Sequence, residues 1–234
     1  DISNADILLV RSVTNVTREL LSHNTTVKFI GSCTIGIDHL DTDYLSEANI
    51  TWANAPGCNA NAVVQYVLTA MAIAQPEWLD KTIGIIGCGN VGGRLYKCLT
   101  ALGVKCVCYD PLLTAASDLT RVGLDELLIQ ADIISCHVPL TTGGRYPSFH
   151  MLGEKELALI KDAALLINTG RGAVIDATAL NKEIDRRSLR GKKISVVLDV
   201  WENEPIVDHA LLDKITLGSP HIAGYSIEGR EQGT

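Results

Sequence analysis

The stretch TIGIIGCGNVGG, residues 82–93, decides the fold of this chain. Its first half is an apolar run typical of a buried strand, and its second half places Gly87, Gly89 and Gly92 in the pattern G-x-G-x-x-G. Apolar residues then recur at helical spacing over residues 91–102. A glycine-rich turn between a strand and a helix indicates dinucleotide binding, because its backbone N–H groups can approach a pyrophosphate at the helix N-terminus.

The rest of the chain alternates strand and helix patterns around this motif. From residue 208 onward we expect a small helix and a strand at 215–217, which we assign to the first domain of the chain. Between residues 81 and 207 we expect further strands at 104–109, 133–136, 164–167 and 194–198, and helices at 124–130, 154–160 and 177–184. This alternation predicts a doubly wound parallel α/β sheet. Ahead of the motif we expect strands at 7–10 and 27–30, helices at 17–21 and 41–48 with Asp41 as N-cap, and a long apolar helix at 59–74.

The late position of the motif predicts that a Rossmann nucleotide-binding domain is inserted into a smaller, flavodoxin-like α/β domain. We expect residues 1–58 to begin the smaller domain, 59–78 to connect, 79–207 to form the nucleotide domain, and 208–234 to return to the smaller domain. The chain does not begin with Met, and its last residues read as the start of a helix. We therefore expect the smaller domain to be truncated at both ends.

Composition excludes several classes of function. The net charge of −7 argues against a general nucleic-acid-binding surface, although a local basic pocket for a small phosphorylated anion remains compatible with it. No apolar helix is long enough to span a bilayer, so we expect no membrane association. The seven cysteines lack the paired spacing of a zinc site, so we expect no metal, buried free thiols and a cytoplasmic protein.

Asp110 follows the second strand of the nucleotide domain, 18 residues after Gly92. An acidic side chain at this place hydrogen-bonds the ribose hydroxyls and repels a 2′-phosphate, so we expect NAD rather than NADP. The alternative is that Asp110 and Pro111 only form a turn.

Four further residues suit carboxylate binding or acid–base chemistry. Arg171 follows an expected strand end, where it can hold a carboxylate through two hydrogen bonds, and the alternative is a surface arginine in a glycine turn. His221 lies on a loop after the last strand, and a proton shuttle needs a pKa near neutrality. Glu202 or Glu204 can orient the imidazole ring, although His221 can equally be structural.

Six motifs occur in the order found in the D-isomer-specific 2-hydroxyacid dehydrogenases, which this chain resembles over nearly its whole length. They are the glycine loop, Asp110, HVPLT at 137–141, NTGRG at 168–172, DVWENEP at 199–205 and HIAG at 221–224. The resemblance implies a catalytic set of Arg171, Glu204 and His221. It also implies cofactor contacts from the following residues: Gly87, Gly89, Asn90, Val91, Gly92, Asp110, His137, Val138, Pro139, Thr169, Asp199 and Gly224.

A closer resemblance within the family implies a small phosphorylated 2-hydroxy acid as substrate. It rests on RSVT at 11–14, GSCTIGIDH at 31–39, APGCNA at 55–60, the loop at 141–150 and the run HIAGYSIEG at 221–229. It implies substrate contacts from Arg11, Ser12, Thr34 and Tyr225, and a simple strand-end loop is the alternative for the first two. The same resemblance implies that the full-length protein is a homodimer, and we expect the C-terminal dimerisation region to be missing from this chain.

Two departures from the family pattern matter. Val138 stands where a threonine is expected, which removes a side-chain contact to the cofactor. The spacing from Arg171 to Glu204 is longer than usual, and we expect a surface insertion near residues 185–192 with the site intact.

The resemblance leaves two other functions open. One is a dehydrogenase for another hydroxy acid, such as phosphoglycerate or glycerate. The other is an NAD(H)-sensing interaction protein on the same fold, which retains the same three catalytic residue types.

Overall fold

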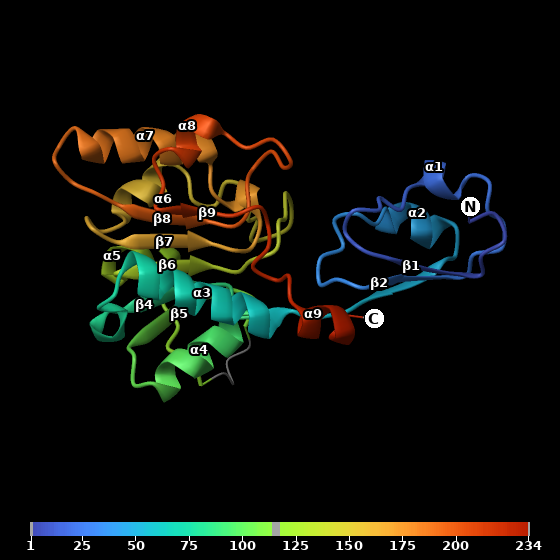
Figure 1. The fold of residues 1–234 in the computed structure, drawn as a ribbon, viewed down its shortest axis with the longest axis horizontal. Helices are drawn as coiled ribbons and strands as arrows, with labels where there is room; N and C mark the ends of the chain where they lie inside the picture. Colours follow the sequence, from blue (N-terminus) through green and yellow to red (C-terminus); the bar gives the residue numbers. More distant parts are fainter. Residues whose placement is uncertain (1, 114–117, 234) are drawn as a thin grey trace. The chain divides into compact units, whose positions relative to one another are not determined.

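The computed structural model describes residues 2–113 and 118–233, which form two compact units (Figure 1). Unit 1 contains the residues up to Asn61 together with those from Gly224 onward, and unit 2 contains Ala62–Ala223. The chain therefore leaves unit 1 once and returns to it once.

Unit 2 is built on a six-stranded parallel sheet in the order β5-β4-β6-β7-β8-β9. Its strands are β4 Ile83–Ile86, β5 Cys106–Tyr109, β6 Ile133–Cys136, β7 Leu165–Asn168, β8 Ser195–Leu198 and β9 Leu217–Gly218. The strand order reverses at β4, because β5 lies on one side of it and β6 on the other. In open α/β sheets ligands bind beyond the carboxyl ends of the strands at such a reversal.

Helices cover both faces of this sheet (Figure 1). They are α3 Ala60–Ala74, α4 Gly92–Ala101, α5 Leu124–Gln130, α6 Glu154–Leu159, α7 Ala177–Ser188 and α8 His209–Leu212, with 3₁₀ turns η1 Trp78–Asp80 and η2 Gly172–Val174. Ile83 and Ile85 pack with α3 and α4, whereas Ile86 packs with α5 to α8. The alternation follows from the two-residue period of a strand.

Unit 1 contains a three-stranded parallel sheet, β1-β2-β3, formed by Ile7–Val10, Phe29–Ser32 and Thr51–Asn54. Its helices are α1 Arg18–Leu21, α2 Thr42–Glu47 and α9 Ile227–Gln232. Asp41 caps α2, as predicted, by accepting a hydrogen bond from the Tyr44 N–H at 3.0 Å. The strand β3 was not expected from the sequence.

Two sequence expectations are corrected by the structure. The return to unit 1 comes after Ala223 rather than at residue 208, because α8 and β9 belong to unit 2 and β9 pairs with β8. The segment near 185–192 is not simply a surface insertion. Its first residues form the last turn of α7, and Arg187 is buried there against the C-terminal carbonyls of α6.

Among the described residues, no helix has the length and apolar character needed to cross a bilayer.

Candidate active site

The glycine loop between β4 and α4 shows a separate physical reason for each glycine. Gly87 has φ of +84°, a left-handed conformation that glycine adopts readily. A Cβ on Gly92 would lie 1.9 Å from the Gly87 carbonyl oxygen, so no side chain fits there. A Cβ on Gly89 would meet nothing within 4 Å. Gly89 therefore leaves open space at the head of α4, where a pyrophosphate can approach the backbone.

Asp110 lies against this loop. Its Oδ2 accepts a hydrogen bond from the Cys88 N–H at 2.8 Å, and its Oδ1 accepts one from the Leu112 N–H at 3.0 Å. A carboxylate has about four acceptor positions, so capacity remains for ribose hydroxyls. The position fits the predicted NAD preference.

The loop after β6 packs beside the glycine loop. A Cβ on Gly87 would lie 2.6 Å from Cγ1 of Val138, so the two loops are in close contact. The imidazole of His137 lies between two hydroxyls, with Nε2 2.9 Å from Ser135 Oγ and Nδ1 3.2 Å from Thr169 Oγ1. Burial lowers the pKa of His137 to about 4, so the ring is neutral at pH 7.

His221 and Glu204 form a hydrogen-bonded pair, in which His221 Nδ1 lies 2.8 Å from Glu204 Oε2. The hydrogen bond that His221 donates to Glu204 raises the pKa of His221. Burial opposes this rise, and the negative charge of Glu204 adds to it. Burial alone would raise the pKa of Glu204, but the hydrogen bonds from His221 and from the Trp201 N–H outweigh it and lower that pKa. The pair is therefore stabilised as imidazolium and carboxylate.

The positive charge of Arg171 lowers the pKa values of both Glu204 and His221, which indicates that Arg171 lies near this pair. The neighbouring Gly172 explains how the segment that carries Arg171 comes close to the segment that carries Glu204. A Cβ on Gly172 would lie 2.0 Å from the carbonyl carbon of Trp201, so only glycine allows the two chain segments to touch. Asn168 adds a hydrogen bond from its Nδ2 to the Arg171 carbonyl at 3.0 Å. The predicted catalytic set is thus brought together in unit 2.

Asp199 holds the loop that carries His221. Its carboxylate is buried and accepts hydrogen bonds from Ser219 Oγ at 2.6 Å and from the N–H groups of Ile222 and Ala223, both at 2.8 Å. The Asp199 carbonyl accepts a hydrogen bond from the His221 N–H at 2.7 Å. His221 has φ of +56°, a costly conformation for a residue other than glycine, and these bonds hold it. The predicted contact of Asp199 with the cofactor stays a prediction.

The predicted substrate residues lie in unit 1. Arg11 and Ser12 follow β1 and are exposed, and Thr34 follows the neighbouring strand β2. These two strand ends are adjacent, since the Cys33 N–H donates to the Val10 carbonyl at 2.8 Å. Thr34 Oγ1 donates to the Gly36 carbonyl at 3.1 Å.

Tyr225 and Gly224 stand at the start of the returning segment of unit 1. The Tyr225 hydroxyl accepts a hydrogen bond from Arg230 at 3.3 Å, and its ring is exposed. A Cβ on Gly224 would lie 2.2 Å from Nδ2 of Asn59, so Gly224 packs tightly against the start of α3. The ligand contacts of these residues remain predictions.

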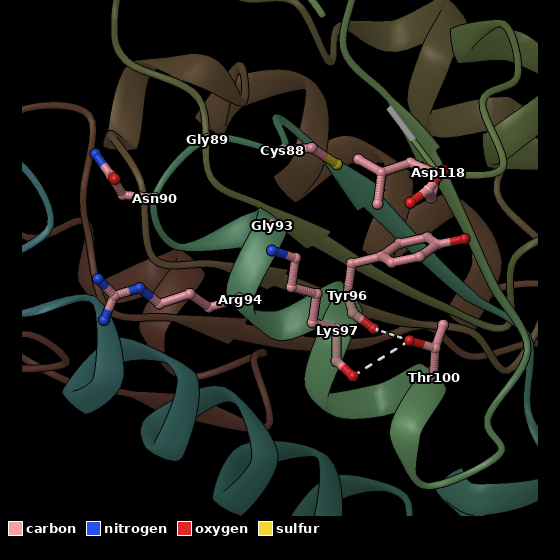
Figure 2. Close-up of a pocket in the computed structure, with 10 residues that line it drawn as sticks. Cys88, Gly89, Asn90, Gly93, Arg94, Tyr96, Lys97, Thr100 and Asp118 are labelled. Atoms are coloured by element: carbon pink, nitrogen blue, oxygen red, sulfur yellow. Dashed lines mark hydrogen bonds between the residues drawn. The ribbon is translucent and has the colours of Figure 1, made fainter. Parts of the chain in front are cut away.

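A cavity of about 640 Å³ lies beside the glycine loop along α4 (Figure 2). Its lining combines Cys88, Gly89 and Asn90 of the loop with residues of α4 and of the segment at 118–119. Arg94 and Lys97 supply positive charge there, and the lining does not include the catalytic set. The cavity therefore marks space next to the cofactor loop rather than the reaction centre.

His150 lies between two carboxylates, those of Glu202 and Asp176, at the N-terminus of α7. His150 Nε2 is 2.7 Å from Glu202 Oε1, and Nδ1 is 3.8 Å from Asp176 Oδ2. Both carboxylates also accept N–H groups of α7, from Ala177 and Ala179. Opposite ring nitrogens face the two acids, so the arrangement is that of a helix cap and carries no argument for a metal.

Sequence reasoning missed three residues that support the site. Trp201 donates its N–H to Glu204 Oε1 at 2.8 Å and its Nε1–H to the Ser219 carbonyl at 2.9 Å. Ser219 binds Asp199, and Tyr66 binds Ser219. Trp201 lies within the motif at 199–205 and Ser219 lies two residues before the motif at 221–224, so both were close to a usable signal in the sequence. Tyr66 lies in α3, where no motif marks it.

Comparison with known proteins identifies the family of this chain. The model of the family described as D-isomer specific 2-hydroxyacid dehydrogenase, NAD binding domain, matches residues 62–223. The chain is 51% identical, over all its length, to an erythronate-4-phosphate dehydrogenase of Cellvibrio japonicus and covers 60% of that protein. It is 50% identical to an erythronate-4-phosphate dehydrogenase of Teredinibacter turnerae and covers 62% of it. The chain thus spans about 60% of the length of these curated relatives.

Two solved structures have the same architecture. A D-lactate dehydrogenase of Aquifex aeolicus complexed with NAD and lactic acid is 28% identical, with a TM-score of 0.80 over 99% of this chain and 80% of that one. An NAD⁺-bound 3-phosphoglycerate dehydrogenase of Entamoeba histolytica is 25% identical, with a TM-score of 0.85 over 99% of this chain and 76% of that one. The prediction of family and cofactor is confirmed: the chain belongs to the D-isomer specific 2-hydroxyacid dehydrogenases, and residues 62–223 are its NAD-binding domain.

Proposed function

We propose that the protein oxidises 4-phospho-D-erythronate to 3-hydroxy-2-oxo-4-phosphobutanoate with NAD, a step of pyridoxal phosphate biosynthesis. The observation that carries the chemistry is the His221–Glu204 pair with Arg171 beside it. The specific substrate is supported by the two relatives of about 50% identity, both named erythronate-4-phosphate dehydrogenase.

The roles of the three residues follow from their charges. Arg171 holds the substrate carboxylate through parallel hydrogen bonds. His221 takes the proton of the C2 hydroxyl on Nε2, since Nδ1 is engaged with Glu204. Glu204 fixes the ring and stabilises the imidazolium that forms, which is the reason that the pKa of His221 is raised. General acid–base catalysis of this kind contributes a factor of about 10²–10⁴ in rate.

The glycine loop and the segments beside it would hold the cofactor. Gly89, Asn90 and Val91 would cradle the pyrophosphate at the head of α4, and Asp110 would bind the adenosine ribose. Bound at this place, NAD would supply the acceptor for the hydride that leaves C2. The neutral ring of His137 packs with Thr169 at the same edge and adds no charge to it.

The substrate phosphate distinguishes this activity from that of related dehydrogenases. Arg11, Ser12, Thr34 and Tyr225 would bind it, because a guanidinium and hydroxyl donors suit phosphate oxygens. A phosphoglycerate-type activity is the second candidate, favoured by the similarity to the 3-phosphoglycerate dehydrogenase structure.

A substrate comparison tests the proposal. NADH formation should be faster, in kcat/KM, with 4-phosphoerythronate than with 3-phosphoglycerate for a protein that carries this chain. Equal or reversed preference would overturn the substrate and leave the family untouched. Binding of NADH without turnover of any 2-hydroxy acid would favour an NAD(H)-sensing interaction protein.

We also propose a cytoplasmic location and a homodimeric full-length protein with neither nucleic-acid nor membrane partners. The seven cysteines are free, and burial raises the pKa of the Cys106 and Cys136 thiols to about 12, as expected of structural thiols in a reducing compartment. The net charge of −7 supports the absence of nucleic-acid partners.

A further inference from the structure

Three side chains form a continuous hydrogen-bonded chain that ends beside His221. The Tyr66 hydroxyl of α3 lies 2.5 Å from Ser219 Oγ, and Ser219 Oγ lies 2.6 Å from Asp199 Oδ1. All three residues belong to unit 2. Asp199 then binds the N–H groups of Ile222 and Ala223, which directly follow His221.

The available protons determine which side chain donates in each of these hydrogen bonds. Asp199 is a carboxylate that accepts three hydrogen bonds, so the single hydroxyl proton of Ser219 points to it. Tyr66 must then donate its own proton to Ser219. Burial raises the pKa of Tyr66 above its usual value, which keeps the phenol protonated as this role requires.

Ser219 is held from a second side as well. The indole Nε1–H of Trp201 donates to the Ser219 carbonyl at 2.9 Å, while the Trp201 N–H holds Glu204. One residue thus fixes both the acid that pairs with His221 and the serine that serves Asp199. Glu204 and Asp199, which both hold His221, are therefore linked to each other through Trp201 and Ser219.

We propose that Tyr66 and Ser219 are positioning residues for His221. They hold the Asp199 carboxylate, Asp199 holds the backbone of residues 221–223, and this keeps the imidazole in line with Glu204. Tyr66 lies in the helix by which the chain enters unit 2, and Ala223 is the last residue before the chain leaves it. The hydrogen-bonded chain therefore ties both connecting segments to the loop that carries the general base.

An NMR titration of the His221 ring tests the positional claim without reference to turnover. In the 234-residue chain, Tyr66→Phe and Ser219→Ala should each lower the pKa of His221 toward its ordinary value, because the imidazole drifts from Glu204. Ser219→Thr keeps the hydroxyl and should retain the raised pKa. Thr216→Val is the matched control. Thr216 lies three residues before Ser219, and its hydroxyl accepts a hydrogen bond from the Val196 N–H rather than binding Asp199.

An unchanged or increased pKa of His221 in both Tyr66→Phe and Ser219→Ala would overturn the proposal. The same holds if Thr216→Val lowers the pKa equally. A variant that fails to fold is recognised by the loss of chemical-shift dispersion in its NMR spectrum. If Ser219→Ala fails in this way, the result for Tyr66→Phe, which removes a single oxygen atom, decides the proposal.

The kinetic part rests on the proposed function. With 4-phosphoerythronate, Tyr66→Phe should lower kcat about tenfold, well short of the ~10²–10⁴ expected from loss of the base itself. KM should change little, and the acid limb of the kcat profile should move to lower pH. If the wild type turns over no 2-hydroxy acid, the proposed function fails while the NMR titration still decides the role of Tyr66.

Discussion

His221 Nδ1 lies 2.8 Å from Glu204 Oε2, and the other carboxylate oxygen of Glu204 accepts the Trp201 N–H at 2.8 Å. Glu204 therefore binds the ring through one oxygen while its second oxygen is anchored to backbone. Nε2 is left as the nitrogen that can exchange a proton with substrate. This arrangement gives a half-exposed histidine on a loop a fixed ring orientation.

Replacing Glu204 by Gln should lower the pKa of His221, because the carboxylate is the largest cause of its rise. In the oxidation direction His221 must be neutral to accept a proton, so the acid limb of the kcat/KM profile should move to lower pH. Glu202→Gln is the control: its carboxylate pairs with His150 instead. A limb that moves equally in both variants would contradict the assignment.

The pair also predicts how stability depends on pH. Because the pKa of His221 is raised, protonation of His221 stabilises the fold at pH values below the ordinary pKa of 6.5. This stabilisation is lost as the pH rises through the pKa of the folded state. The lowered pKa of Glu204 stabilises the fold above its ordinary value of 4.5, and this is lost as pH falls through the folded-state pKa. A double-mutant cycle by urea unfolding should give its largest coupling between these values, at most about 1 kcal/mol for such an exposed pair. Coupling that grows above pH 8 would be inconsistent with this scheme.

Gly89 and Gly92 should respond differently to alanine. Gly92→Ala should lower the free energy of unfolding by about 1–3 kcal/mol, because its Cβ would collide with the Gly87 carbonyl at 1.9 Å. Gly89→Ala should change stability by less than about 0.5 kcal/mol, since its Cβ enters open space, yet it should weaken NADH binding. Urea unfolding and NADH fluorescence titration measure the two effects. Unchanged NADH affinity in Gly89→Ala would show that the pyrophosphate lies elsewhere.

Removing the charge of Asp110 should relax the preference for NAD. Asp110→Asn keeps an acceptor for the Cys88 N–H but no longer repels a 2′-phosphate. The ratio of dissociation constants for NADPH and NADH should fall in titrations of the variant. Asp132→Asn serves as control, because Asp132 binds the Thr82 N–H at the opposite end of β4. The same change of ratio in both variants would refute a local role.

Arg187 should be among the most sensitive positions away from the site. Its guanidinium is buried and binds Glu183 at 2.6 Å and the carbonyls of Leu157 and Ile160 at 3.1 and 2.7 Å. Arg187→Ala should cost about 3–5 kcal/mol in unfolding free energy. Arg186→Ala, which removes a more exposed partner of the same glutamate, should lower the unfolding free energy much less. Equal losses of unfolding free energy in the two variants would show that the buried contacts of Arg187 are not the source of its stabilising effect.

The sequence was informative where a property is local. The glycine loop predicts its strand, turn and helix because each glycine has a requirement set by residues within a few positions, such as Gly92 against Gly87. The apolar strands of unit 2 were recognisable because both of their faces are buried. The strand Thr51–Asn54 escaped prediction because it is only half buried and carries no continuous apolar run.

Long-range features lay outside such reasoning. The sequence predicts a strand at 215–217 but does not indicate which sheet it joins. The structure pairs β9 with β8, so the domain boundary lies after Ala223. Arg187 looks like a surface residue in sequence and becomes buried only because α6 ends beside it. Tyr66 and Ser219 are 153 residues apart, and neither suggests the other.

The most direct test of the account compares NADH formation from 4-phospho-D-erythronate by the wild-type protein and by His221→Ala. We predict that the wild type turns the substrate over and that His221→Ala loses a factor of about 10²–10⁴ in kcat, with NADH affinity retained. Near-normal turnover by His221→Ala would contradict the central claim that this imidazole accepts the proton of the substrate hydroxyl.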